Sequence, residues 1–268
     1  MFRIRWLLAV LLLWLPMQAV KADALVLVHG YLGDANSWFE SGVAQVLQRA
    51  GWRFGGFLVP GPQGVSIRGE GSGKNRYYVM TLPSEAPFEI QLRLFEPMLK
   101  AVRKRHSEER LSIVGHSLGG VLARYAMVLH PDLKVDDLIT IASPHLGTNK
   151  AELALLAGST PLSMMAPMFG AGTINRSRGL YSELVREAPG TFLYWLNHQK
   201  HPDAHYFSVI RKDDGGISLG DMVVPEASQD MNKVAALRGR SYTRHSASGH
   251  GLETEDGRNI LLALQYSR

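Results

Sequence analysis

Short apolar runs alternate with longer amphipathic stretches along most of this chain. Residues 24–28 are all apolar, which is typical of a strand that is buried on both faces of a sheet. Further runs of this kind predict strands at 54–59, 77–82, 111–114, 138–142, 206–210 and 242–244. Because strands alternate with helix-forming stretches, the pattern predicts the α/β class, with a mostly parallel central sheet and helices on both faces.

Helices are predicted where apolar residues recur every three or four positions. In 87–105, Ile90, Leu94 and Met98 lie four residues apart. Similar spacing predicts helices at 35–50, 118–129 and 255–265. By contrast, 60–76 is dense in glycine and proline, a composition that predicts a surface loop.

The alternation is interrupted between about 149 and 205. This stretch includes 161–169, in which three methionines accompany two prolines and a phenylalanine. We interpret 149–205 as a cap insertion in a single domain that spans 23–268, and 161–169 as a lid over the functional site. The alternative is that these methionines fill gaps in an ordinary core, as methionines commonly do.

The first 22 residues have the pattern of a signal peptide. Arg3 and Arg5 precede an apolar run that is too short to cross a bilayer comfortably, and Val20 and Ala22 are small residues suited to cleavage before Asp23. We therefore expect an exported protein, periplasmic or secreted. The alternative is that 1–22 stays uncleaved and anchors the protein to a membrane.

Composition removes several classes of function. The sequence contains no cysteine, which excludes cysteine nucleophiles, thiolate metal sites and disulfides. The net charge of +5 comes mostly from 1–22, which hold three of the 29 lysines and arginines and none of the 24 acidic residues. The rest of the chain is close to neutral, so we expect no nucleic-acid partner.

Candidate chemistry begins at 115–119, which reads Gly-His-Ser-Leu-Gly. This motif lies between a predicted strand and a predicted helix, the context of a nucleophile elbow. The serine of such an elbow sits on a tight, strained turn that exposes its hydroxyl, and the glycines avoid collisions between strand and helix. Ser117 is therefore the candidate nucleophile.

A serine hydroxyl needs a general base, and the base needs a carboxylate to orient it. In this arrangement the acid follows the serine in the chain and the histidine comes last. The best acid is Asp221, in the loop after the predicted strand 206–210. Asp213 and Asp214 lie closer to that strand and are the alternatives.

The base is expected in the last loop before the final helix. His250 lies there between Gly249 and Gly251, which let the loop bend toward the serine. His245, nearer the last predicted strand, is the alternative. His116 is next to the nucleophile, and its place on the elbow points it away from the role of base.

Two backbone N–H groups are expected to form an oxyanion hole. One belongs to Leu118, the residue after the nucleophile, and the other comes from the loop after the first strand. That loop reads His-Gly-Tyr-Leu-Gly over 29–33, and we assign the second donor to Tyr31. The tyrosine side chain is then available to line a pocket.

Four motifs in this order resemble those of bacterial triacylglycerol lipases and esterases of the α/β-hydrolase superfamily. They lie at 29–33, 115–120, 142–147 and 221–225, and the resemblance extends from about residue 24 to the end except for the cap. It implies a Ser117–Asp221–His250 triad, an acyl-enzyme intermediate and a structural loop at 143–147. Calcium-binding lipases of this group have an aspartate where this chain has Leu252, so we expect no metal.

The function predicted from these residues and this resemblance is hydrolysis of carboxylic esters, with small-molecule or lipid acyl esters as substrates and transient contact with a lipid interface. No cofactor is expected. A thioesterase or an amidase using the same triad is the second interpretation, and a non-catalytic binding protein with this fold is the third.

Overall fold

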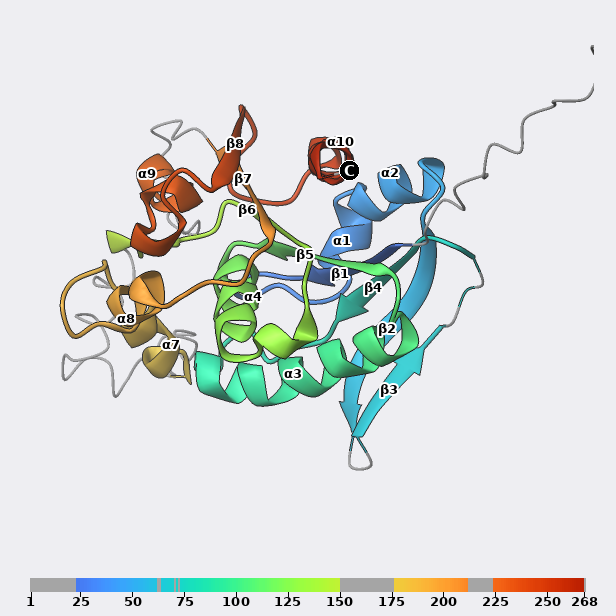
Figure 1. Ribbon diagram of the computed structural model, residues 1–268, viewed down its shortest axis with the longest axis horizontal. Coiled ribbons are helices and arrows are strands. Elements are labelled where there is room, and N and C mark those ends of the chain that lie inside the picture. The colour runs from blue at the N-terminus through green and yellow to red at the C-terminus, as the bar shows by residue number, and fades with distance from the viewer. Residues whose placement is uncertain are drawn as a thin grey trace, which may run out of the picture.

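One mixed sheet organises the part of the chain that the computed structural model describes, namely residues 23–61, 64–69, 71, 73–149, 176–211 and 224–267 (Figure 1). Its strand order is β3-β2-β4-β1-β5-β6-β7-β8. The strands are β1 Asp23–Val28, β2 Arg53–Gly61, β3 Gly64–Arg68, β4 Arg76–Met80, β5 Arg110–His116, β6 Asp137–Ile141, β7 His205–Arg211 and β8 Ser241–Ser246. Only β3 runs antiparallel to its neighbour among these described strands, so the predicted α/β class and mostly parallel sheet are confirmed.

Helices cover both faces of the sheet (Figure 1). The longer ones are α3 Phe88–Arg105 and α4 Leu118–Leu129 on one face, and α2 Val43–Arg49 and α10 Thr254–Tyr266 on the other. The shorter ones are α1 Ser37–Glu40, η1 Pro131–Leu133, α7 Arg178–Glu183, α8 Phe192–His198, α9 Glu226–Gln229, η3 Met231–Lys233 and η4 Ala235–Leu237.

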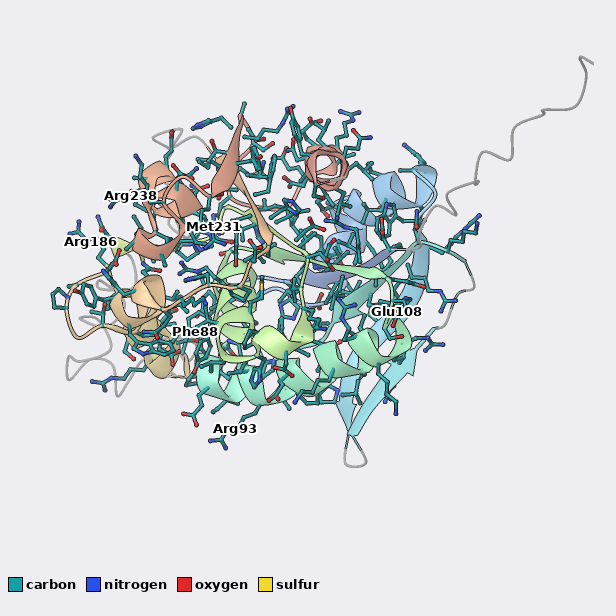
Figure 2. The ribbon with its side chains drawn as sticks, viewed as in Figure 1. Phe88, Arg93, Glu108, Arg186, Met231 and Arg238 are labelled. Atoms are coloured by element: carbon teal, nitrogen blue, oxygen red, sulfur yellow. The ribbon has the colours of Figure 1, made fainter. Side chains whose placement is uncertain are left out.

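The central strands explain the two hydrophobic cores. In β1, Ala24, Val26 and Val28 pack in the core with α3 and α4, whereas Leu25 and Leu27 pack in the core with α2 and α10. Successive side chains of a strand point to opposite faces, so an unbroken apolar run fills both cores at once. The helix α3 has one buried and one exposed face. Figure 2 shows this for Phe88, which points into the molecule, and for Arg93, which points away from it.

Two predicted elements are corrected. The predicted loop 60–76 contains β3, whose Val65 and Ile67 pack against the core, because a hairpin with β2 supplies the partner that a lone strand lacks. The predicted helix 35–50 is two helices, α1 and α2. They are separated at Gly42, where φ is +83° and an added Cβ would lie 2.5 Å from Thr254 Oγ1.

Two predicted segments fall outside the described residues. These are the signal peptide at 1–22 and the lid segment 161–169. The cap boundaries stay a prediction, although α7 and α8 lie within 149–205 and contribute Leu180 and Leu196 to the core. Within the described ranges, no helix is both long and apolar enough to cross a bilayer.

Candidate active site

Ser117 lies on the sharp turn between β5 and α4. Its φ of 51° and ψ of −125° place it in a region that side chains other than glycine rarely adopt. The turn is held by the Ser117 N–H, which donates to Ile141 O at 2.8 Å, and by the Gly120 N–H, which donates to Ser117 O at 3.1 Å. This is the strained geometry of the predicted nucleophile elbow.

The glycines around the elbow are required because neighbouring atoms leave no room for a side chain. A Cβ on Gly115 would lie 2.3 Å from Gly120 Cα, and a Cβ on Gly119 would lie 2.5 Å from His29 O. A Cβ on Gly120 would lie 2.2 Å from Ser143 Oγ, so the 143–147 loop packs directly against the elbow. A side chain at Gly115 or Gly119 would collide with backbone atoms, and one at Gly120 would collide with the side chain of Ser143.

The structure brings together Ser117 and His250 from positions far apart in the sequence. His250 Nε2 lies 3.0 Å from Ser117 Oγ, a hydrogen-bond distance at which an unprotonated Nε2 can accept the hydroxyl proton. His245 is on β8 instead, half exposed, with its Nδ1 4.0 Å from Glu226 Oε2. The geometry therefore favours His250 over His245 as the partner of the serine.

His116 supports the base residue through the backbone. Its Nε2 lies 2.8 Å from the carbonyl oxygen of His250, so the ring donates a hydrogen bond there. Burial, together with the nearby His250 ring, lowers the pKa of His116 to about 3, so the ring is neutral near pH 7. Sequence reasoning excluded His116 as a base but missed this contact, for which the sequence offers only its position beside the nucleophile.

The acid cannot be located in the same way. Asp221 and its alternatives Asp213 and Asp214 lie outside the described residues, so the assignment stays a prediction. The structure describes the chain on either side of them. β7 ends at Arg211, and the chain continues from Val224 into α9.

The loop after β1 forms a tight turn beside the elbow. The Gly33 N–H donates to Gly30 O at 3.2 Å, and Leu32 has a φ of 56°. An added Cβ on Gly30 would lie 2.9 Å from Ser117 Cβ, so this turn approaches the serine closely. Tyr31 lies in this turn next to Gly30, and its role as an oxyanion donor stays a prediction.

The second predicted donor, Leu118, is the first residue of α4. Backbone N–H groups in the first turn of a helix have no partner within the helix, and the helix dipole favours negative charge there. His29 holds the turn after β1 in place, because its Nδ1 donates to Gly30 O at 3.1 Å and its Nε2 accepts from the Leu82 N–H at 3.2 Å. Burial lowers the pKa of His29, which fits this neutral form.

The side chain of Tyr31 has partners of its own. Its hydroxyl donates to Ser177 Oγ at 3.0 Å and lies 2.5 Å from the hydroxyl of Tyr181, whose ring meets the Tyr31 ring edge-on. These contacts join the turn to α7. The sequence left this side chain available to line a pocket, but in the structure its hydroxyl is hydrogen-bonded to α7 and to the residue before it.

No grouping of three or more histidine, aspartate or glutamate side chains suited to a metal ion occurs among the described residues. The chemistry that the described groups offer is proton transfer between a hydroxyl and an imidazole, beside backbone donors at a helix terminus.

Comparisons with known proteins find solved structures with a similar fold. The structure is similar to the product of the gene lin2722 from Listeria innocua, with a TM-score of 0.58 and 14% identity over 91% of this chain and 92% of that one. It is similar to the lipase BlEst2 of Bacillus licheniformis in its mature form (TM-score 0.56, 15% identity, 92% and 93% covered). A "putative cell surface hydrolase" from Lactobacillus plantarum has a TM-score of 0.56, 17% identity and 92% of both chains covered.

These likenesses show the fold, which is that of the α/β-hydrolases. Among curated proteins, no sequence matches this chain. A family model matches residues 89–223, just over half of the chain, and it covers the elbow and Ser117. The chain therefore belongs to the family described as "Putative serine esterase (DUF676)".

Proposed function

We propose that the protein hydrolyses carboxylic esters, with Ser117 as nucleophile, His250 as general base and acid, and Asp221 as the carboxylate that orients His250. The observation that carries this proposal is the 3.0 Å approach of His250 Nε2 to Ser117 Oγ on a strained elbow. Family membership supports the esterase class. The proposed substrates are lipid acyl esters.

The proposed reaction needs two half-steps. Ser117 Oγ attacks the ester carbonyl carbon while its proton passes to His250 Nε2, and the carbonyl oxygen becomes an oxyanion facing the N–H groups of Tyr31 and Leu118. The carbon–oxygen bond to the alcohol then breaks, and His250 returns the proton to that alcohol. Water attacks the resulting acyl-enzyme with His250 as base, which releases the carboxylic acid and restores Ser117.

Two features support a lipid substrate in transient contact with an interface. Leu32, at the turn beside Ser117, is an exposed apolar residue with 63% of its surface accessible. The similar protein from Bacillus licheniformis is named a lipase. In the proposed complex, Leu32 contacts the acyl chain of the substrate.

A fluorophosphonate probe combined with an ester series tests this proposal. The probe should label Ser117 in the wild-type protein and leave Ser117→Ala unlabelled, because labelling requires an activated hydroxyl. p-Nitrophenyl esters from acetate to palmitate, with an emulsified triglyceride, should show turnover that rises with chain length. Labelling without turnover of any ester, but with turnover of a thioester or an anilide, would reject ester hydrolysis.

We also propose that the protein is exported after cleavage between Ala22 and Asp23. Asp23 is the first residue of β1, so this cleavage leaves the strand whole, whereas cleavage further on would shorten the strand that leads to the Tyr31 turn. N-terminal sequencing of protein from the envelope or the medium should begin at Asp23. Recovery only of a product that retains Met1 would contradict export by cleavage.

A further inference from the structure

Arg211 connects three parts of the molecule from the carboxyl end of β7. Its side chain is only 3% exposed. Nη2 pairs with Asp256 Oδ2 at 2.5 Å in α10, and Nη1 donates to Ser246 Oγ at 2.7 Å at the end of β8. Nη2 also lies 3.4 Å from the carbonyl oxygen of Gly251.

The contacts of Arg211 lie on both sides of His250. Ser246 precedes the loop that carries His250, Gly251 follows His250 directly, and Asp256 is in the first turn of the helix beyond. Leu252 packs against the core, but the two glycines of the loop have open space beside them, since an added Cβ on Gly249 or on Gly251 would meet nothing within 4 Å. Hydrogen bonds at its ends therefore have a large part in setting where His250 lies.

Gln229 extends the same network through the backbone of Arg211. Its Oε1 accepts from the Arg211 N–H at 2.7 Å, and its Nε2 donates to Arg211 O at 3.2 Å and to Val224 O at 2.7 Å. One buried side chain thus joins the end of β7 to the chain that enters α9. Arg211 is held on the backbone side while its guanidinium holds the His250 loop.

A buried ion pair contributes little to the free energy of unfolding by itself. Desolvation opposes both charges, and burial raises the pKa of Asp256 despite the neighbouring guanidinium. Well-packed apolar side chains commonly stabilise a core as well as such a pair does. What apolar residues cannot supply is a set of directed bonds to a hydroxyl, a carbonyl and a carboxylate at once.

We propose that Arg211 is a positioning residue that, with Asp256 and Gln229, holds the His250 loop in the place from which Nε2 reaches Ser117. Arg211 acts through the loop and does not touch the reacting atoms. The inference rests on the proposed role of His250 as the base, and it adds a determinant that lies outside the triad.

The molecule contains a matched control pair at the opposite edge of the sheet. Arg110, at the start of β5, pairs with Asp137, at the start of β6, through Nη2 and Oδ1 at 2.8 Å. Asp137 is 3% exposed and also accepts from Ser112 Oγ at 2.6 Å. The two pairs share residue types and a largely buried aspartate but lie at opposite ends of the strands.

The test compares Arg211→Met/Asp256→Asn with Arg110→Met/Asp137→Asn. Each double variant removes both charges, so no lone buried charge remains, and each asparagine keeps an acceptor, for the Glu253 N–H or for Ser112. We expect the Arg211 pair variant to lose about 10- to 100-fold in kcat and in fluorophosphonate labelling rate, with KM within about threefold. The Arg110 pair variant should keep both rates within about twofold, whatever its melting temperature.

Two further measurements separate positioning from general damage. Arg211→Lys keeps a positive charge beside Asp256 but loses the forked donors of the guanidinium. Its kcat should lie between those of the wild type and the double variant. Amide hydrogen exchange should rise in 246–252 of the Arg211 variants and not elsewhere in β5 or α4. Equal losses of kcat in the two double variants, or unchanged exchange in 246–252, would overturn the proposal.

A failure of the proposed function would look different from a failure of this inference. A wild-type protein that neither turns over esters nor labels at Ser117 would reject the esterase proposal. Hydrogen exchange would still show whether Arg211 holds the loop. Normal wild-type turnover together with an unaffected Arg211 pair variant would reject the inference alone.

Discussion

The amino ends of the parallel strands form one edge of the central sheet, the amino edge, and their carboxyl ends form the other, the carboxyl edge. The two edges contain similar ion pairs but differ in backbone conformation and in the residues around those pairs. Each has an arginine–aspartate pair, Arg110–Asp137 at the amino edge and Arg211–Asp256 at the carboxyl edge. Three of the four non-glycine residues with positive φ in the described ranges, Leu32, Ser117 and Ala142, follow β1, β5 and β6. Local strain thus gathers where the carboxyl ends of parallel strands meet, as is usual for sites in this kind of sheet.

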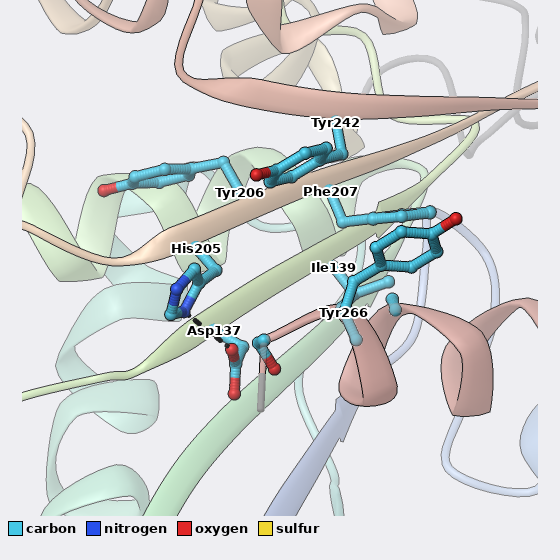
Figure 3. A pocket seen from close by; sticks show the side chains of 9 residues that line it. Asp137, Ile139, His205, Tyr206, Phe207, Tyr242 and Tyr266 are labelled. Carbon is cyan, nitrogen blue, oxygen red and sulfur yellow. Dashed lines mark ion pairs between the residues drawn. The ribbon is translucent and has the colours of Figure 1, made fainter.

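A small pocket lies at the amino edge (Figure 3). Its lining includes Tyr206, Phe207, Tyr242 and Tyr266 and the ion pair of His205 with Asp137, and its volume of about 10 Å³ is room for about one water molecule. Tyr242 and Tyr266 stack at its rim with ring centroids 6.1 Å apart. The amino edge therefore holds packed aromatic side chains, whereas the carboxyl edge holds Ser117 and the loop that carries His250.

Replacing the nucleophile should have the largest effect. Ser117→Ala should lower ester turnover by at least about 10⁴-fold, because the covalent route is lost while the backbone of the turn can remain. Circular dichroism and a thermal melt would show whether the fold is retained. A folded variant with more than about a hundredth of the wild-type rate would remove Ser117 from its role.

The two histidines near the end of the chain should differ next most strongly. His250→Ala should lower kcat by about 10³-fold or more, because the group 3.0 Å from the serine hydroxyl is lost. His245→Ala, on the exposed strand β8, is the matched control and should stay within about threefold. Steady-state kinetics on one ester would check both, and the reverse order would transfer the base to His245.

His116 should have a smaller effect, through the backbone of His250. His116→Leu removes the donor to the His250 carbonyl and should lower kcat about tenfold, whereas His116→Gln retains an N–H donor and should lose less. Equal kinetics for the leucine and glutamine variants would show that this hydrogen bond does not place the base.

The same residue predicts a pH dependence of stability. The pKa of His116 in the folded protein is about 3, below its ordinary value near 6.5, so the unfolded chain binds more protons between these values. The contribution of His116 to stability is therefore present above pH 6.5 and declines as the pH falls toward 3. Melting temperatures from pH 7 to 4 should fall less steeply for His116→Gln than for the wild type.

The amino edge should show the smallest effect on turnover. Tyr242→Ser removes a ring stacked on Tyr266 and should cost about 1 kcal/mol of stability with no change in kcat/KM. Denaturant unfolding and ester kinetics on the same preparation would check this. A clear loss of kcat/KM would break the contrast between the edges and give this one a part in function.

Much of the sheet and of the elbow could be predicted because their signals are local. An apolar run such as β1 has one arrangement that buries all of its side chains, between two layers of helices. The glycines at 115 and 119 are required by atoms only a few residues away or in the adjoining strand, so the motif implies its own turn. The strand β3 was missed because its stability comes from pairing with β2, in a segment whose glycines and prolines favour a loop.

The sequence by itself determined the order of the described strands other than β3 and of the longer helices, the elbow at Ser117 and a short set of candidate partners. Only the tertiary structure decided that His250 rather than His245 approaches the serine, because the difference depends on how the loop after β8 returns to β5. It also decided the network of Arg211, Gln229 and Asp256, which joins the end of β7 to the loop that carries His250. Hydrogen bonds between residues distant in sequence leave no periodic signal in the chain, since they depend on the folded positions of their donors and acceptors.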